Sequence, residues 1–84
     1  MKAPKVVLVE WVDSSGTGGW QPLTQVVKME PDRCISVGFV VNETDKYVTL
    51  IQSFTNRKDS TTDEADHALT IPKRAITRIV TVRK

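Results

Sequence analysis

The stretch that decides the fold is RCISVGFVVN, residues 33–42. Its odd positions from 35 read Ile, Val, Phe and Val, and its even positions from 34 read Cys, Ser, Gly and Val. Side chains of a β-strand point alternately to its two faces, so this pattern predicts a strand with one large apolar face and one small-residue face. The polar residues 42–45 are typical of a turn, and residues 46–54 then return as the second strand of a hairpin.

Three further segments, at 5–12, 67–71 and 76–82, each predict a strand because turn-forming residues bound runs of β-branched residues. Val, Ile and Thr make up about a third of the chain, whereas Ala and Leu are scarce, which argues against a helical bundle. Pro72 has a fixed φ suited to a single helical turn. The predicted fold is therefore mostly β: a small five-stranded SH3-like or Sm-like barrel with a short helical turn before the last strand.

The length of 84 residues predicts one domain over residues 1–84. A single cysteine cannot form an internal disulfide. The net charge of +2 is too small to imply a polyanionic partner by itself. No apolar run approaches the ~20 residues that cross a bilayer, and the apolar run near the N-terminus is too short for a secretory signal. We therefore expect no membrane partner and a cytoplasmic location.

The connecting segments leave alternatives open. Residues 22–29 begin with a proline and carry apolar residues at helical spacing, yet they fit either a short helix or a short strand. Residues 13–19, DSSGTGG, predict a flexible loop. Residues 55–66 contain no Val, Ile, Leu or aromatic residue, which predicts a solvated loop that is either functional or disordered.

Several strand faces that a small barrel would turn outward carry apolar residues. They are Val6, Leu8, Val40, Val80 and Val82. A monomer of this size rarely exposes so much apolar surface, so we expect a homo-oligomer. The alternative is that these residues pack under loops or under the segment 23–27.

No catalytic set is expected. His67 and Cys34 are the single His and the single Cys, and they lie on separate predicted strands, so a nucleophilic pair with an orienting acid is not indicated. Cys34 is interpreted as a packed or partly exposed thiol without chemistry. The acidic run at 59–67 fits a solvated loop better than a weak metal site, because its spacing matches no calcium-loop pattern. We expect a protein that is not an enzyme and uses no metal or cofactor.

A donor-rich loop at 14–19 lies between Trp11 and Trp20. An indole beside such a loop can stack on a base while backbone N–H groups and hydroxyls bind phosphate or ribose. The loop lacks the Lys-Ser/Thr of a nucleotide-hydrolase P-loop. The alternative interpretation is a plain flexible connection.

The C-terminal segment 71–84 carries five basic residues and no acidic residue. Two of the five, Lys73 and Arg74, follow Pro72 on the predicted turn, where neighbouring donors can face a phosphate. The segment either contacts an anion or carries the ordinary solvated charges of an edge strand.

Four stretches suggest a family: VEWVDS at 9–14, GW at 19–20, CISVGF at 34–39 and LTIPKRAITRI at 69–79. In these motifs the chain resembles a family of small tailed-bacteriophage proteins, over nearly its whole length. The resemblance implies phage origin and expression in the host cytoplasm, and it implies no established reaction. Small phage proteins often counter host defences, some as oligomeric sponges that sequester nucleotide immune signals, which is an analogy between functional classes.

The family pattern places the candidate ligand-binding residues at Trp11, Asp13, Ser14, Trp20, Ser36, Lys73 and Arg74. The first hypothesis is a phage-encoded, non-enzymatic binding protein that captures a small anionic ligand of the cyclic-nucleotide class. Trp20 would stack on the base, Lys73 and Arg74 would neutralise phosphate, and Asp13 would accept a hydrogen bond from a ribose hydroxyl or base amine.

Two alternatives come from other functional classes. A nucleic-acid-binding barrel would use the basic last strand and exposed aromatic residues, and its affinity would fall steeply with salt. A protein-interaction module, acting on a host protein or as a minor virion component, would use apolar outer faces and a sheet edge.

Overall fold

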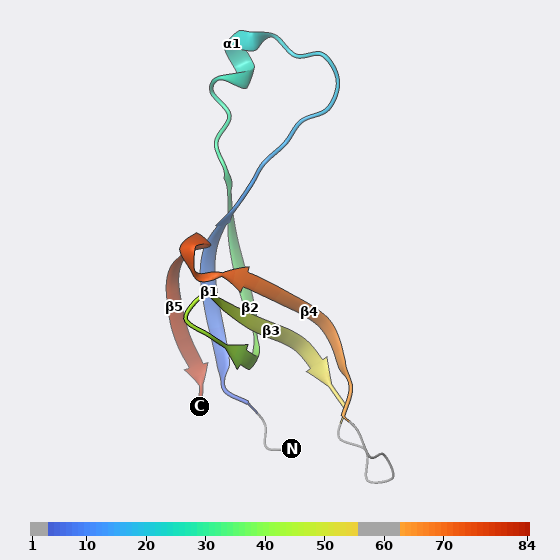
Figure 1. The fold of residues 1–84 in the computed structure, drawn as a ribbon, viewed down its shortest axis with the longest axis vertical. Coiled ribbons are helices and arrows are strands. Elements are labelled where there is room, and N and C mark those ends of the chain that lie inside the picture. The colour runs from blue at the N-terminus through green and yellow to red at the C-terminus, as the bar shows by residue number, and fades with distance from the viewer. Residues whose placement is uncertain (1–3, 56–62) are drawn as a thin grey trace.

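The structure is a computed structural model, and it describes residues 4–55 and 63–84. Its elements in chain order are β1 (Val6–Asp13), α1 (Leu23–Val26), β2 (Asp32–Glu43), β3 (Tyr47–Phe54), β4 (Ala65–Pro72), the 3₁₀ helix η1 (Lys73–Ala75) and β5 (Ile76–Arg83). The strands form one antiparallel sheet in the order β4-β3-β2-β1-β5 (Figure 1). The prediction of a mostly-β chain with a short helical turn before the last strand is confirmed.

The predicted strands agree with the observed ones to within two residues at every end. The hairpin between β2 and β3 closes at Thr44, whose side-chain oxygen accepts the backbone N–H groups of Lys46 and Tyr47, both at 3.1 Å. Of the two alternatives for residues 22–29, the structure has the helix, although α1 is only four residues long. Most of the predicted loop at 55–66 lies outside the described residues.

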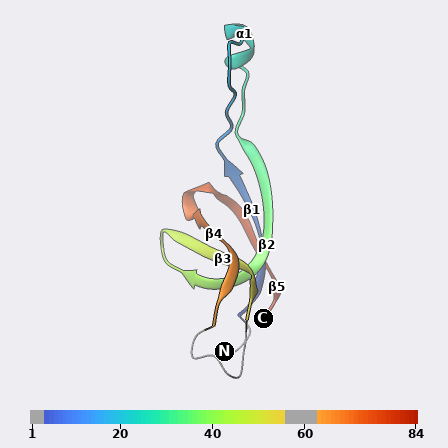
Figure 2. The same ribbon diagram turned by 90° about the vertical axis from the view of Figure 1, so that its right-hand side faces the viewer.

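The core lies on one face of the sheet, called here the inner face. Its buried side chains are Val7, Val9, Val48, Leu50 and Ile71, from β1, β3 and β4. The four-residue step from Pro72 through η1 to Ile76 joins the two edge strands and spans at most about 14 Å. The two edges therefore approach each other at this end, and the sheet curls around the core (Figure 2). Within the described ranges β4 and β5 share no ladder, so the sheet is curled but open.

The alternation of β2 is confirmed, and its small residues are the ones that face the core. Gly38 is buried, and a Cβ at this position would lie 2.8 Å from the carbonyl oxygen of Ile51. On the opposite face Ile35 is 67% and Val37 is 56% exposed. A tight curl leaves no room for large side chains on the inside of β2, which is why the large apolar face turns outward.

One prediction about the outer faces is wrong: Val40 packs against the buried core rather than pointing outward. The other four residues of this group, Val6, Leu8, Val80 and Val82, lie outside the buried core, and the first three of them are half-buried. Leu8 on β1 lies directly between Val37 on β2 and Val80 on β5, and directly opposed residues of antiparallel strands share a face. Together with Ile35, two positions along β2, these three residues form a surface called here the outer patch. Val82 near the C-terminus is also exposed.

A long segment between β1 and β2 extends away from the sheet. Residues 14–31, called here the arm, run away from the strands and carry α1 at their far end (Figures 1 and 2). The molecule measures 58 × 26 × 20 Å and its radius of gyration is 17.1 Å, against about 12 Å for a compact chain of this length. The alternative that segment 23–27 covers the outer faces is therefore wrong, because the arm lies over no strand and Leu23 and Val27 are exposed.

None of the helices in the described part of the chain is long and apolar enough to cross a membrane.

Candidate functional site

The arm presents apolar side chains to solvent. Trp20 is fully exposed, Leu23 is 75% exposed and Val27 is 72% exposed, and Met29 and Val26 are exposed as well. Every arm residue except the half-buried Ser15 is exposed. Residues 14–27 also contain no charged side chain. Such a cluster is unusual for a surface that meets only water, because apolar area in water costs free energy.

Short-range contacts give the arm its shape. The hydroxyl of Ser15 donates a hydrogen bond to the carbonyl oxygen of Glu30 at 2.6 Å, which ties the outgoing chain to the returning chain. The carbonyl oxygen of Pro22 accepts the N–H groups of Gln25 and Val26 at the start of α1. Gly19 has a φ of 77°, a left-handed conformation that glycine adopts without strain. A single helical turn is marginal by itself, so the arm is the least anchored part of the described chain.

Asp13 and Ser14 stand at the base of the arm. Asp13 is the last residue of β1 and opposes Asp32, the first residue of β2. Its carboxylate accepts the backbone N–H of Ser14 at 2.8 Å. Both residues are exposed, so they remain accessible to a partner that reaches the base of the arm.

Trp11 and Ser36 meet on the inner face. The indole Nε1 of Trp11 donates a hydrogen bond to the side-chain oxygen of Ser36 at 3.0 Å, and the ring packs against the buried core. Trp11 also lines a surface cavity of about 470 Å³ with Arg33 and Cys34. The contact satisfies the indole N–H, so this pair has a structural role in the described chain.

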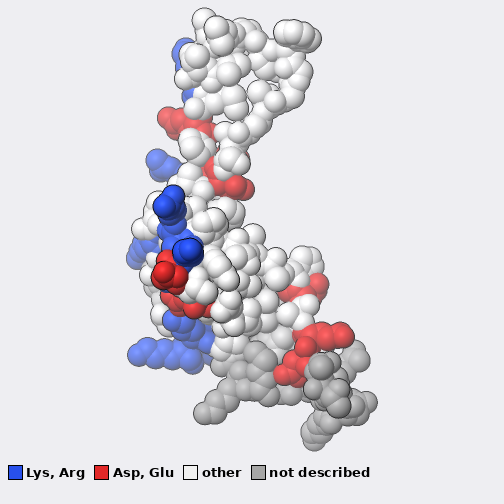
Figure 3. Space-filling view, viewed as in Figure 1, with Lys and Arg blue, Asp and Glu red and all other residues white. Residues whose placement is uncertain are grey.

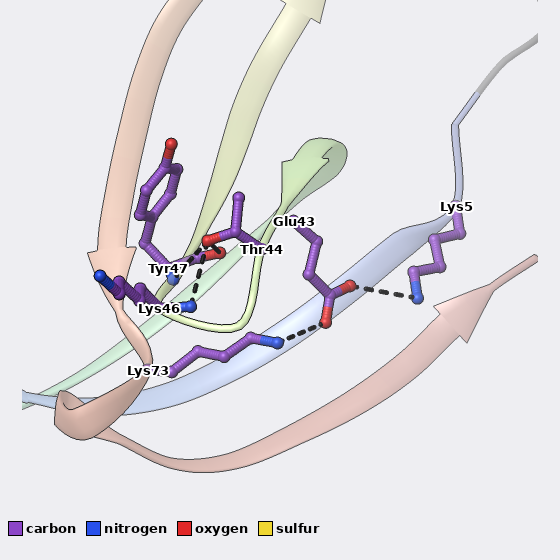
Figure 4. A network of polar contacts seen from close by, with 6 residues as sticks. All are labelled: Lys5, Glu43, Thr44, Lys46, Tyr47 and Lys73. Carbon is purple, nitrogen blue, oxygen red and sulfur yellow. Dashed lines mark hydrogen bonds and ion pairs between the residues drawn. The ribbon is translucent and has the colours of Figure 1, made fainter.

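Lys73 and Arg74 lie on η1, as the sequence predicts. The Nζ atom of Lys73 donates a hydrogen bond to the carboxylate of Glu43 at 3.0 Å, and Nζ of Lys5 lies 3.9 Å from the other carboxylate oxygen (Figure 4). The hydrogen bond and the charge of Lys73, with a smaller contribution from Lys5, hold the pKa of Glu43 below its ordinary value. Glu43 therefore offsets much of the positive charge that Lys73 would offer to a phosphate.

Lys46, which the sequence did not single out as a site residue, lies beside η1. The backbone N–H of Lys73 donates a hydrogen bond to the carbonyl oxygen of Lys46 at 2.8 Å. Lys46, Lys73 and Arg74 line a shallow cavity of about 520 Å³ together with Asp45, and these three basic residues are called here the basic corner. Figure 3 shows basic side chains gathered over η1 with acidic side chains next to them. Among residues 4–55 and 63–84, no ion pair involves Lys46 or Arg74.

The structure divides the seven predicted site residues among three places. Trp20 lies on the arm, with Asp13 and Ser14 at its base, whereas Lys73 and Arg74 lie on η1. Trp11 and Ser36 form the third place, on the inner face. One chain therefore does not bring the indole of Trp20 to the basic residues, and the single nucleotide pocket of the first hypothesis is not assembled within a protomer.

Leu23 and Val27 are the binding candidates that the sequence analysis missed. From the sequence, the segment 23–27 has a role only in one alternative, as a cover for the outer strand faces. The available signal was the run without charge at 14–27, which follows a loop of small residues and ends shortly before Pro31. A segment bounded in this way can leave a sheet as readily as it can fold onto one.

The side chains of the His and the Cys each make one polar contact. Nδ1 of His67 lies 3.0 Å from the carboxylate of Asp66, and both side chains are mostly exposed. Sγ of Cys34 lies 3.9 Å from the carbonyl oxygen of Asp32. Across the ranges that the structure describes, no group of three or more His, Cys, Asp and Glu side chains could hold a metal ion. Part of the acidic run at 59–67 lies outside these ranges.

Comparison with known proteins found no family model, no curated protein and no solved structure that matches the chain.

Proposed function

We propose that this chain is a non-enzymatic binding protein that engages a partner protein through the arm. The observation that carries the proposal is the exposure of Trp20, Leu23 and Val27 on one projecting, uncharged segment. Tryptophan side chains that fill a partner's pocket dominate the energetics of many interfaces. The curled sheet would serve as the rigid support that holds the arm away from the rest of the molecule.

The partner that suits the arm is apolar at the point of contact. Removing Trp20 from water would bury on the order of 200 Å². At roughly 25 cal/mol per Å², that contributes about 5 kcal/mol of gross stabilisation before the cost of association. A charged pocket would find no opposite charge to pair with in residues 14–27. The proposal therefore favours the protein-interaction module among the three predicted functions.

The experiment compares two immobilised baits in a bacterial lysate. One bait is the full chain, and the other carries Trp20→Ser and Leu23→Ser. We expect at least one protein, identified by mass spectrometry, on the first bait and not on the second, unless the partner is a second copy of the chain. A third bait with Thr24→Ala, at an exposed polar arm position, is the control and should retain what the first bait retains. If the arm substitutions change neither the captured proteins nor self-association, the proposal fails.

We also propose a closed barrel in place of an open curled sheet. The strand order and the short step through η1 between the edge strands support an SH3-like or Sm-like barrel that closes between β4 and β5. Phage origin and a place in the host cytoplasm rest on the family resemblance and stay predictions.

A second candidate function is capture of a small anion, a nucleotide included, at the basic corner. It is favoured by the cavity beside Lys46 and Arg74, two cations without an ion pair in the described ranges. Calorimetric titration with cyclic dinucleotides tests it, with Lys46→Gln plus Arg74→Gln as the variant. Heat with the native chain that disappears in the variant supports capture, and no heat with any of these ligands contradicts it. Binding only to nucleic acid, weakening steeply with salt, would favour the nucleic-acid alternative instead.

A further inference from the structure

Two apolar surfaces have no partner among residues 4–55 and 63–84: the arm and the outer patch of Leu8, Ile35, Val37 and Val80. Ile35 and Val37 are more than half exposed, although they lie in the middle of a well-formed strand. The two surfaces have matching chemistry. Residues 14–27 carry no charge, and beside the patch Nη1 of Arg78 lies 3.9 Å from Oε1 of Glu10, so these two charges partly offset each other. Arg33, on the same face of β2 as Ile35, is exposed at the edge of the patch and would stay in water beside the arm.

We propose that two copies of this chain form a two-fold dimer in which the arm of each copy lies over the outer patch of the other. This inference rests on the proposed function, because it names the partner that the arm engages. The arm cannot reach the patch of its own chain in the observed conformation, since it leaves the ends of β1 and β2 in the direction away from the sheet (Figure 1).

The reach of the arm fits this arrangement. Ile35 lies three residues after Asp32 on β2 and Leu8 lies five residues before Asp13 on β1, so the patch extends from about 10 Å to about 17 Å from the base of the arm. Trp20 lies seven residues beyond Asp13, at most about 24 Å from the base when extended. If two copies meet antiparallel with the bases of their arms together, each Trp20 falls over the patch of its partner. Strands β1 and β2 of each copy thus carry its own arm and, with Val80 of β5, form the patch that binds the arm of the other copy.

The area argues for a second copy rather than an unrelated protein. The exposed apolar side chains of one arm offer on the order of 500 Å², counting about 200 Å² for Trp20 and about 60–120 Å² for each smaller side chain. One such contact removes about 1,000 Å² in total, which is below the usual ~1,600 Å² of a stable interface. Two-fold symmetry repeats the contact, so the dimer reaches about 2,000 Å².

Sedimentation of the full chain from about 1 to 100 μM tests the dimer. We expect a dimer for the native chain. Trp20→Ser in the arm and Val37→Glu in the patch should each raise the dissociation constant of the dimer by about a thousandfold. Each substitution affects both symmetry-related contacts, and each contact loses about 30-fold. Gln52→Glu places the same carboxylate on β3 outside the patch and should leave the dimer intact. Circular dichroism should show that all three variants keep their strands.

Cross-linking tests the seating of the arm directly. In a background of Cys34→Ser, one sample carries Leu23→Cys and the other carries Val37→Cys. We expect a disulfide-linked heterodimer when the two are mixed under mild oxidation. A mixture of Leu23→Cys with Asp45→Cys, at the turn between β2 and β3, should give no such product.

The outcomes separate this inference from the proposed function. A native chain that stays monomeric, or a dimer that survives both Trp20→Ser and Val37→Glu, overturns the exchanged-arm dimer. If the monomeric chain still captures a bacterial protein in an arm-dependent way, the proposed function stands and only the identity of the partner was wrong. If neither self-association nor capture depends on the arm, both fail.

Discussion

The curled sheet and the arm differ in the contacts that hold them together. In the sheet, backbone ladders pair β1 with both β2 and β5, and the buried side chains come from strands far apart in the sequence. In the arm, the hydrogen bonds that the structure describes stay within residues 14–31 or reach only Asp13. Folding free energy is therefore concentrated in the sheet, and the exposed apolar side chains of the arm contribute little to it.

The largest expected effect separates these two regions. Ile71→Ala removes a side chain that is 1% exposed from a core of only a few residues, and should cost about 2–5 kcal/mol of the free energy of unfolding. Trp20→Ala removes a larger side chain from the arm and should change the stability of the isolated monomer by less than about 0.5 kcal/mol. Urea denaturation of both variants at low protein concentration measures the difference. Equal losses would show that the arm is part of the folding unit.

Alanine substitutions of two glycines, one in the sheet and one in the arm, compare the same two regions. Gly38→Ala would place a Cβ 2.8 Å from the carbonyl oxygen of Ile51, so the curl of the sheet would have to relax at a cost of about 1–3 kcal/mol. Gly16→Ala in the arm meets nothing within 4 Å, and should be neutral or stabilise by about 0.4–1 kcal/mol through the unfolded state. Thermal denaturation of the two variants decides the matter. A neutral Gly38→Ala would mean that β2 and β3 are less tightly curled than described.

The sequence predicts the sheet far better than it predicts the arm, and Gly38 shows why. Alternation along 33–42 follows directly from strand geometry, so strands and hairpin are readable from the chain. Which face of β2 turns inward depends on the curl of the whole sheet. The small side chains of Ser36 and Gly38 are compatible with an inward face, but they do not specify it from the sequence alone. The place of the arm is harder still, because helical spacing at 23–27 is compatible with packing on this sheet or on another molecule.

The candidate site shows the same limit. Residue types suggested that Trp20 and Lys73 act together, because aromatic stacking and positive charge are both needed to hold a nucleotide. Residue type does not report distance, and the two side chains belong to separate parts of the fold. The pairing of Lys73 with Glu43 could not be predicted from the sequence either, since it joins residues that are 30 positions apart.

Replacing the arm tests whether the sheet needs it. A variant in which Asn-Gly replaces residues 14–31 joins Asp13 to Asp32, which already face each other in register. Shortening the loop about ninefold lowers its closure entropy cost by roughly 2 kcal/mol, so the stability of the monomer should stay the same or rise. Melting temperature at low protein concentration measures this. A clear fall would show that the arm stabilises the sheet through contacts within one chain.

The smallest expected effect lies in the sheet, at Glu43. Its pKa is lowered in the folded chain by Lys73 and Lys5, so its contribution to stability is present above the ordinary value of 4.5 and is lost as the pH falls through the lowered value. Glu43→Gln should cost no more than about 0.5 kcal/mol at neutral pH, because the pair is partly exposed and screened. The cost should shrink in about 1 M salt, where the Debye length is about 3 Å, and should vanish below the pH range in which the carboxylate titrates. Glu30→Gln in the arm is the control, and its stability should follow that of the native chain at every pH. If both substitutions gave the same pH profile, the contact between β2 and η1 would contribute nothing beyond an ordinary surface charge.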